Sequence, residues 1–163
     1  MIIKVCGMRE PQNIREVAAL AINWIGFIFY ERSKRFVERC PTEQQATDSE
    51  QLSPKKVGVF VNATIESMME TASAYKLDYL QLHGNESPED CHTLQKRGYS
   101  LIKAFPIASK EDFKKTKEYE GRVDYFLFDT RCEGYGGSGK RFDWSILTEY
   151  KGETPFLLSG GIR

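Results

Sequence analysis

A repeated alternation of short apolar runs with polar, helix-like stretches limits the fold of this chain more than any other feature. The runs begin roughly 20 to 30 residues apart, which is the spacing of β–α units rather than of a solenoid repeat. Several are apolar throughout, as Ile25–Phe29 shows, and strands buried on both faces have this composition. The sequence therefore predicts a parallel sheet with helices outside it. The expected strands are Ile2–Val5, Trp24–Phe29, Lys56–Val61, Tyr79–Leu82, Ser100–Phe105, Tyr125–Phe128 and Pro155–Leu158.

The stretches between these runs carry helix start signals. A proline suits a first helical turn, and Ser, Thr or Asp before an acidic turn suits an N-cap. A further helix is expected near Thr42–Leu52. The expected caps or first residues of the others are Pro11, Thr64, Ser87, Ser109 and Asp143.

Successive β–α units form either an open doubly wound sheet or a (β/α)8 barrel. An open dinucleotide-binding sheet should show G-x-G-x-x-G after its first strand, and residues 6–9, Cys-Gly-Met-Arg, do not match it. We therefore predict an α/β fold of the TIM-barrel type, as a single domain over residues 1–163. Because the seventh expected strand ends near residue 158, we expect this barrel to be incomplete, without its last helix–strand–helix segment.

The charge balance and the cysteines exclude several classes of function. Lys plus Arg and Asp plus Glu number 23 each, so no basic excess points to nucleic acid and no charged tail points to a membrane surface. The four cysteines show no C-x-x-C spacing, so we expect no metal site. Without an export signal or an apolar span, we expect a cytoplasmic protein with free thiols.

Active sites of barrels lie at the carboxyl ends of the strands, where Cys6 and Asp129 directly follow the first and sixth apolar runs. A thiol near cations can act as a thiolate base, and a carboxyl in a partly apolar mouth can act as an acid. Together they are a candidate general acid/base pair. A buried structural thiol and a loop-anchoring carboxylate are the alternatives.

Glycines near the last strands are candidates for binding phosphate. Gly137 and Gly139 lie in a Gly-rich loop whose backbone N–H groups could approach an anion, although the loop lacks the spacing of a nucleotide-binding Walker motif. Gly160 and Gly161 follow the seventh run, where barrels bind phosphate. The alternatives are a flexible lid and a tight turn.

Two further side chains could bind substrate at the same edge. Arg35 belongs to a basic loop after the second run and could pair with a carboxylate, or it could be a solvated charge. His83 follows the fourth run and could orient a substrate or anchor a loop.

Several short segments together resemble the phosphoribosylanthranilate isomerases, barrel enzymes of tryptophan biosynthesis. Each segment is short, but they occur in the same order and at strand ends over nearly the whole chain. They are Lys4–Met8, Ser33–Val37, Val57–Asn62, Gln81–Glu86, Phe128–Thr130, Gly136–Gly139 with Phe142–Trp144, and Leu158–Gly161.

The resemblance implies an aldose–ketose isomerase that carries out an Amadori rearrangement of N-(5-phosphoribosyl)anthranilate, with no cofactor, metal or redox step. The family's general base maps onto Cys6 and its general acid onto Asp129. Arg35 matches the arginine that holds the anthranilate carboxylate, and His83 matches a residue lining the site. Gly160 and Gly161 match half of the phosphate cradle.

Two departures leave alternatives open. Arg9 stands where many members have Thr, and the turn after an eighth strand, which supplies phosphate-binding N–H groups in the family, lies beyond the printed sequence. We therefore expect reduced turnover from a chain ending at Arg163. The alternatives are a catalytically impaired fragment and a related sugar-phosphate isomerase, although the latter use Asp at the position of Cys6. The sequence leaves the oligomeric state open.

Overall fold

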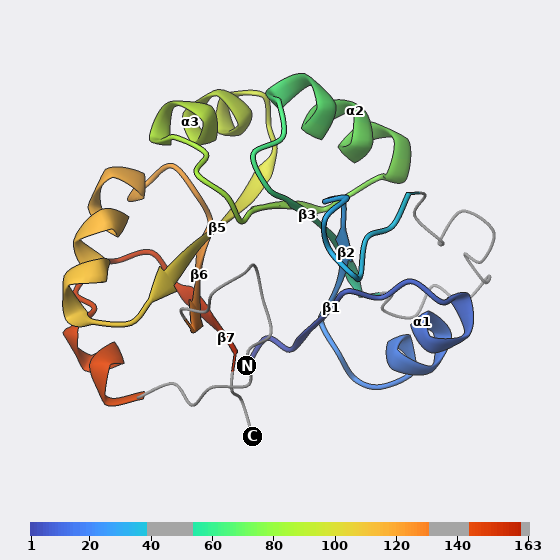
Figure 1. Ribbon diagram of the computed structural model, residues 1–163, viewed down its shortest axis with the longest axis horizontal. Coiled ribbons are helices and arrows are strands. Elements are labelled where there is room, and N and C mark those ends of the chain that lie inside the picture. Colours follow the sequence, from blue (N-terminus) through green and yellow to red (C-terminus); the bar gives the residue numbers. More distant parts are fainter. Residues whose placement is uncertain (39–53, 131–143, 161–163) are drawn as a thin grey trace. The chain divides into compact units, whose positions relative to one another are not determined.

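The computed structural model describes residues 1–38, 54–130 and 144–160, in which strands and helices alternate except that the second strand is followed directly by the third (Figure 1). The helix expected near Thr42–Leu52 lies outside these residues. The chain divides into two compact units, Met1–Gln81 and Leu82–Arg163, which are described separately. In chain order the elements are β1 (Lys4–Cys6), α1 (Pro11–Ala18), β2 (Trp24–Ile28), β3 (Lys55–Phe60), α2 (Ile65–Tyr75), β4 (Tyr79–Leu82), α3 (Pro88–Lys96), β5 (Ser100–Ile107), the 3₁₀ helix η2 (Lys110–Tyr119), β6 (Tyr125–Thr130), the 3₁₀ helix η3 (Trp144–Glu149) and β7 (Phe156–Ser159).

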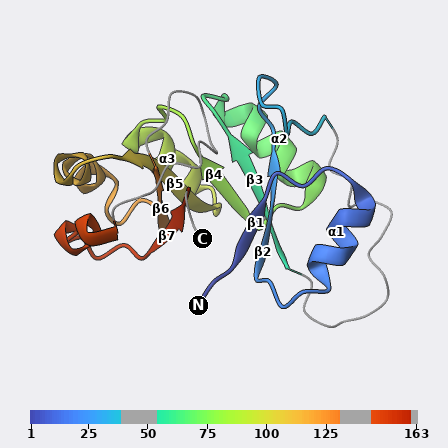
Figure 2. The same ribbon diagram turned by 60° about the horizontal axis from the view of Figure 1, so that its bottom comes forward.

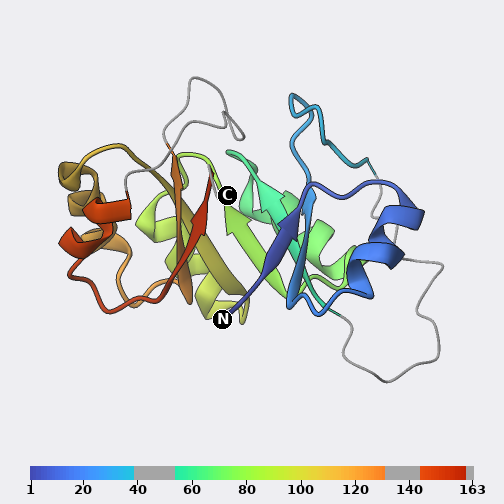
Figure 3. The same ribbon diagram turned by 90° about the horizontal axis from the view of Figure 1, so that it is seen from below.

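In the first unit, β1, β2 and β3 are hydrogen-bonded in chain order and run parallel. All five residues of β2 are buried, which explains why its sequence is apolar without alternation. Ile25 and Phe27 pack with Val37, and Ile14 of α1 packs against this cluster. Helices α1 and α2 lie on the same side of these strands (Figure 3). The predicted parallel sheet with helices outside it is confirmed here.

The predicted helix starts are confirmed at two caps. The Thr64 side chain accepts a hydrogen bond from the Ser67 backbone N–H at the start of α2, 3.2 Å. Ser87 and Asp90 form a reciprocal capping box at the start of α3. Both caps satisfy backbone N–H groups that the first helical turn would otherwise leave without partners.

In the second unit, β5, β6 and β7 are also parallel and in chain order. The η2 and η3 helices lie on one side of β6 and β7 (Figure 2). Phe128 of β6 packs there against Phe113, Tyr150 and Phe156. No described helix in either unit is long and apolar enough to cross a membrane.

The helix predicted after Ser109 forms, but as a 3₁₀ helix. Its face that packs on the sheet includes Phe113 and Thr116, which are buried, and Tyr119, which contacts Phe105. These residues follow one another at intervals of three, the period of a 3₁₀ helix rather than of an α-helix. The Thr116 hydroxyl donates to the Phe113 carbonyl, 2.8 Å, within this tighter turn.

Four strands, β1, β5, β6 and β7, continue one or two residues past their apolar runs. β1 includes Cys6, which pairs with Gly26, and β6 includes Asp129, which pairs with Ser159. Cys6 and Asp129 directly follow their apolar runs, as expected, and both lie within the paired ends of β1 and β6. Backbone pairing continues past the apolar runs, so both residues are held by the sheet rather than by loops.

Candidate active site

The Cys6 thiol lies at the carboxyl end of β1, in space that Gly26 leaves open on β2. A β-carbon placed on residue 26 would lie 2.6 Å from Cys6 Sγ, closer than such contacts occur, and 3.1 Å from Lys4 Nζ, which is a tight contact. The thiol and the ammonium therefore share the space over Gly26. The sequence did not single out Lys4, although residues two apart on a strand project from the same face.

Arg35 is placed beside Cys6 by the loop that follows β2. This loop returns to the strand through the Val37 N–H, which donates to the Ile28 carbonyl at 2.9 Å. Arg35 Nη1 donates to the Cys6 carbonyl at 3.2 Å. The Arg35 side chain covers Gly7, whose φ of +86° and lack of a side chain both favour glycine.

The end of β1 therefore combines one thiol with two cationic side chains, Lys4 and Arg35. A nearby cation stabilises a thiolate relative to the neutral thiol. Arg35 also has guanidinium N–H groups beyond the one that bonds Cys6, and these can pair with a ligand carboxylate in a bidentate manner. Chemically, this edge can hold a thiolate base next to an anion-binding group.

The second unit brings His83 and Asp129 together. His83 Nε2 lies 3.6 Å from Asp129 Oδ2, and their side chains are 20% and 10% exposed. His83 directly follows β4. Asp129 lies near the carboxyl end of β6, where it pairs with Pro106 of β5 and Ser159 of β7. A mostly buried carboxyl with one imidazole neighbour can donate or accept a proton at this strand end.

Of the predicted phosphate-binding residues, only Gly160 lies within the described part of the chain. It follows Ser159, the partner of Asp129, and has a φ of +80°. This left-handed conformation favours glycine and turns the chain at the strand end that carries Asp129. Gly137, Gly139 and Gly161 lie outside the described residues.

Cys91 does not belong to this set. Its side chain is fully buried in α3, and burial raises the pKa of its thiol to about 12, with the Glu86 carboxylate adding to the rise and Lys103 opposing it. Cys91 is therefore a protonated core side chain at neutral pH, with no nucleophilic or basic role.

The rate of alkylation is expected to distinguish the buried Cys91 thiol from an ordinary exposed thiol. With its pKa near 12, only about one Cys91 thiol in ten thousand is ionised at about pH 8, so iodoacetamide should leave it unlabelled in the native protein. Peptide mass mapping after timed labelling measures this. The urea-unfolded protein is the control and should label at Cys91. Labelling of the native protein at the unfolded rate would contradict the buried, protonated state.

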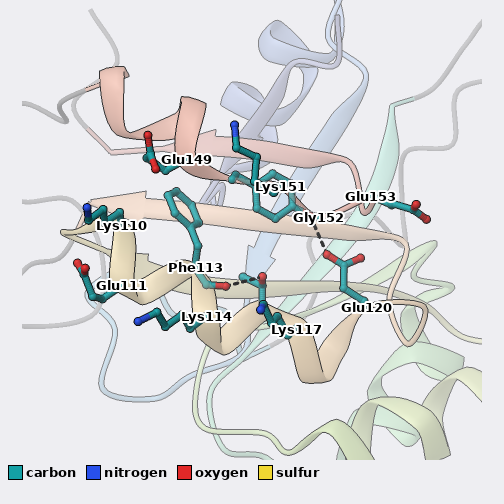
Figure 4. A pocket seen from close by; sticks show the side chains of 12 residues that line it. Lys110, Glu111, Phe113, Lys114, Lys117, Glu120, Glu149, Lys151, Gly152 and Glu153 are labelled. Atoms are coloured by element: carbon teal, nitrogen blue, oxygen red, sulfur yellow. Dashed lines mark hydrogen bonds between the residues drawn. The ribbon is translucent and has the colours of Figure 1, made fainter.

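A groove in the second unit is lined by a different set of residues (Figure 4). It is formed by η2, the end of η3 and the turn that follows, and none of the predicted site residues lines it. Its rim carries both signs of charge in equal number, so it shows no preference for an anion. The charged residues are Lys110, Lys114, Lys117, Lys151, Glu111, Glu120, Glu149 and Glu153.

Among residues 1–38, 54–130 and 144–160, no three His, Cys, Asp or Glu side chains are grouped closely enough to hold a metal ion. The polar residues brought together are thus Cys6 with Lys4 and Arg35 in one unit, and Asp129 with His83 in the other.

Comparisons with known proteins give consistent results. The family model of N-(5′-phosphoribosyl)anthranilate (PRA) isomerase matches residues 3–163. N-(5′-phosphoribosyl)anthranilate isomerase of Parabacteroides distasonis is 96% identical over 163 residues, which are all of this chain and 74% of the relative.

Solved structures agree with the sequence matches. Phosphoribosyl anthranilate isomerase from Thermotoga maritima superposes with a TM-score of 0.82 at 31% identity, covering 99% of this chain and 78% of that one. A phosphoribosyl anthranilate isomerase in complex with reduced 1-(o-carboxyphenylamino)-1-deoxyribulose 5-phosphate superposes with a TM-score of 0.77 at 27% identity, covering 99% of this chain and 77% of that one. The fold class predicted from the sequence, an α/β barrel, is confirmed.

Proposed function

The chain belongs to the N-(5′-phosphoribosyl)anthranilate isomerase family, and from this premise we propose that Cys6 is the general base and Asp129 the general acid of the reaction. The reaction is the Amadori rearrangement of N-(5′-phosphoribosyl)anthranilate, an aminoaldose, to the 1-deoxyribulose aminoketose in tryptophan biosynthesis. The strongest support from the geometry is that each proposed residue lies at the carboxyl end of a parallel strand, beside a side chain suited to its role.

Ring opening is the step assigned to Asp129. Its carboxyl group protonates the ribose ring oxygen, and the ring opens to a Schiff base between C1 and the anthranilate nitrogen. His83, 3.6 Å from Asp129 Oδ2, limits the directions in which the carboxyl can point. Because the Asp129 side chain is only 10% exposed, little bulk water competes for its proton.

Proton abstraction is the step assigned to Cys6. The thiolate removes the proton from C2 of the Schiff base, which gives an enolamine that tautomerises to the ketone. Lys4 shares the space over Gly26 with the thiol, on the same face of β1. The iminium form of the Schiff base withdraws electrons from C2, so a thiolate is a sufficient base.

Arg35 and the glycines are proposed to bind the two ends of the substrate. Arg35 pairs with the anthranilate carboxylate, and Gly160 with Gly161 supplies part of the phosphate cradle, to which the loop carrying Gly137 and Gly139 adds. The family member solved with a phosphorylated deoxyribulose ligand supports a small phosphorylated substrate. We further propose that residues 1–163 belong to one catalytic domain and that the protein acts in the cytoplasm.

The activity itself is tested by incubating the purified protein with freshly made N-(5′-phosphoribosyl)anthranilate, whose anthranilate fluorescence falls on rearrangement. A protein-dependent loss of fluorescence, with appearance of the aminoketose in the mass spectrum, is expected. Loss of fluorescence at the rate of buffer alone would contradict the assignment.

Replacement of Arg35 by Met is expected to raise KM more than it lowers kcat. A hydrogen-bonded charge pair contributes about 1.5–3 kcal/mol, so KM should rise on the order of 10- to 100-fold. Steady-state fluorescence measures both constants. Arg32→Met is the matched control, because Arg32 is an exposed cation of the same loop, and it should change KM little. An unchanged KM in Arg35→Met would contradict the carboxylate-binding role.

A further inference from the structure

A lysine lies fully inside the second unit, where an apolar side chain would be expected. Lys103 lies in the middle of β5 and is 2% exposed. Its Nζ donates to the Gly84 carbonyl at 2.8 Å and is also within 3.3 Å of the Leu82 carbonyl. It forms an ion pair with Glu86 Oε2 at 3.1 Å, and both side chains are 3% exposed. The lysine therefore binds three residues of one turn, Leu82, Gly84 and Glu86, and this turn contains His83.

Glu86, at the end of the same turn, stabilises the turn through further hydrogen bonds. Its two carboxylate oxygens accept the Gly84 N–H at 3.2 and 3.0 Å. The Glu86 carbonyl accepts a hydrogen bond from the Tyr119 hydroxyl of η2, at 2.8 Å. The backbone on both sides of His83 is thus fixed by buried polar contacts.

Lys103 makes these contacts from the helix side of the sheet, away from the proposed acid. Its Nζ lies 5.6 Å from the centre of the Phe105 ring and 5.9 Å from that of Tyr119. Phe128 also packs on this side, against Phe113, so the next residue, Asp129, projects from the opposite face. Lys103 consequently touches the turn and not the carboxyl that His83 approaches.

We propose that the Lys103–Glu86 pair positions His83, holding the Leu82–Glu86 turn so that the imidazole stays against Asp129. Lys103 and Glu86 are positioning residues, and the inference rests on the proposed function of Asp129. A buried ion pair adds little to the stability of a fold, because apolar residues of similar volume stabilise it as well or better. Its value here is geometric, since the pair and its hydrogen bonds specify one conformation of a turn that could otherwise adopt several.

The test reads His83 directly, by side-chain ¹H–¹⁵N spectra. The chain has two histidines, and the second, His92, is exposed on α3 and serves as an internal reference. In Lys103→Met the His83 signals should move by more than their line width while those of His92 stay in place. The kcat should fall on the order of 10- to 100-fold with KM nearly unchanged, as misplacement of a site residue causes. Glu86→Gln, which keeps an acceptor for Lys103, should show a smaller change in both readouts.

Lys115→Met is the matched control. It removes a lysine from another ion pair of the same unit, that with Asp112, but the Lys115 side chain is 61% exposed. Neither histidine signal nor kcat should change in it.

The backbone amide spectrum shows whether each variant is folded. If Lys103→Met unfolds, Lys103→Met/Glu86→Leu removes the unpaired buried carboxylate and is read in the same way. Unmoved His83 signals in either folded variant would overturn the positioning role. Displaced His83 signals with unchanged kcat would support the positioning role and overturn instead the part that His83 has in the proposed function.

Discussion

Replacing Asp129 by Asn is expected to lower kcat on the order of 10²- to 10⁴-fold, the contribution of a general acid. Asparagine has the same shape and keeps an oxygen that His83 can approach, but it has no acidic proton to give to the ribose ring oxygen. The binding of substrate should change much less, so KM should stay near its original value. Steady-state loss of anthranilate fluorescence measures both constants.

Asp124→Asn is the matched control for this substitution. Asp124 lies just before the amino end of β6, where its carboxylate accepts the Leu101 N–H at 2.7 Å. The same chemical change is thus made beside the opposite end of the same strand, where barrels place residues that serve stability. Asp124→Asn should keep its kcat. If Asp129→Asn also kept most of its kcat while folded, Asp129 would not be the acid.

The second large effect is expected for Cys6→Ala, with kcat again lower on the order of 10²- to 10⁴-fold. Alanine removes the only group proposed to take the C2 proton. The fold should persist, because residue 6 pairs with Gly26 through its backbone. Circular dichroism checks the fold, and the fluorescence assay measures turnover.

Cys91→Ala is the control for the loss of a thiol. Its burial and raised pKa make Cys91 a protonated core side chain, so its loss should cost stability without removing turnover. A Cys6→Ala protein with most of the original kcat would show that the base is another group.

The strands could be predicted from the sequence because each lies in an environment that its residues reveal. β2 is buried along its whole length, and its unbroken apolar run predicts this burial. The exact ends of β1 and β6 could not be predicted. Cys6 and Asp129 are polar, and their place in the sheet depends on backbone hydrogen bonds to Gly26 and Ser159, which leave no trace in local composition.

The candidate site was predictable where position along the chain implies position in the fold. Cys6, Asp129, Arg35 and His83 could be singled out because each lies at or just after the end of an expected strand. Their roles remain predictions.

Lys103 and Glu86 were missed as contributors because their importance comes from a contact between residues far apart in sequence. Lys4 was missed although it lies two residues from Cys6 on the same face of β1. A lysine inside an apolar strand was the available signal for Lys103. Its partner, 17 residues earlier, could be found only from the fold.

The isotopic composition of the product made in heavy water tests the central chemistry most directly. If Cys6 takes the C2 proton and the enolamine is then protonated from solvent, the aminoketose should carry one deuterium at C1 after O–H and N–H positions are exchanged back. A product with no deuterium at C1 would show that the hydrogen taken from C2 reaches C1 without exchange, and it would contradict protonation of the enolamine from solvent.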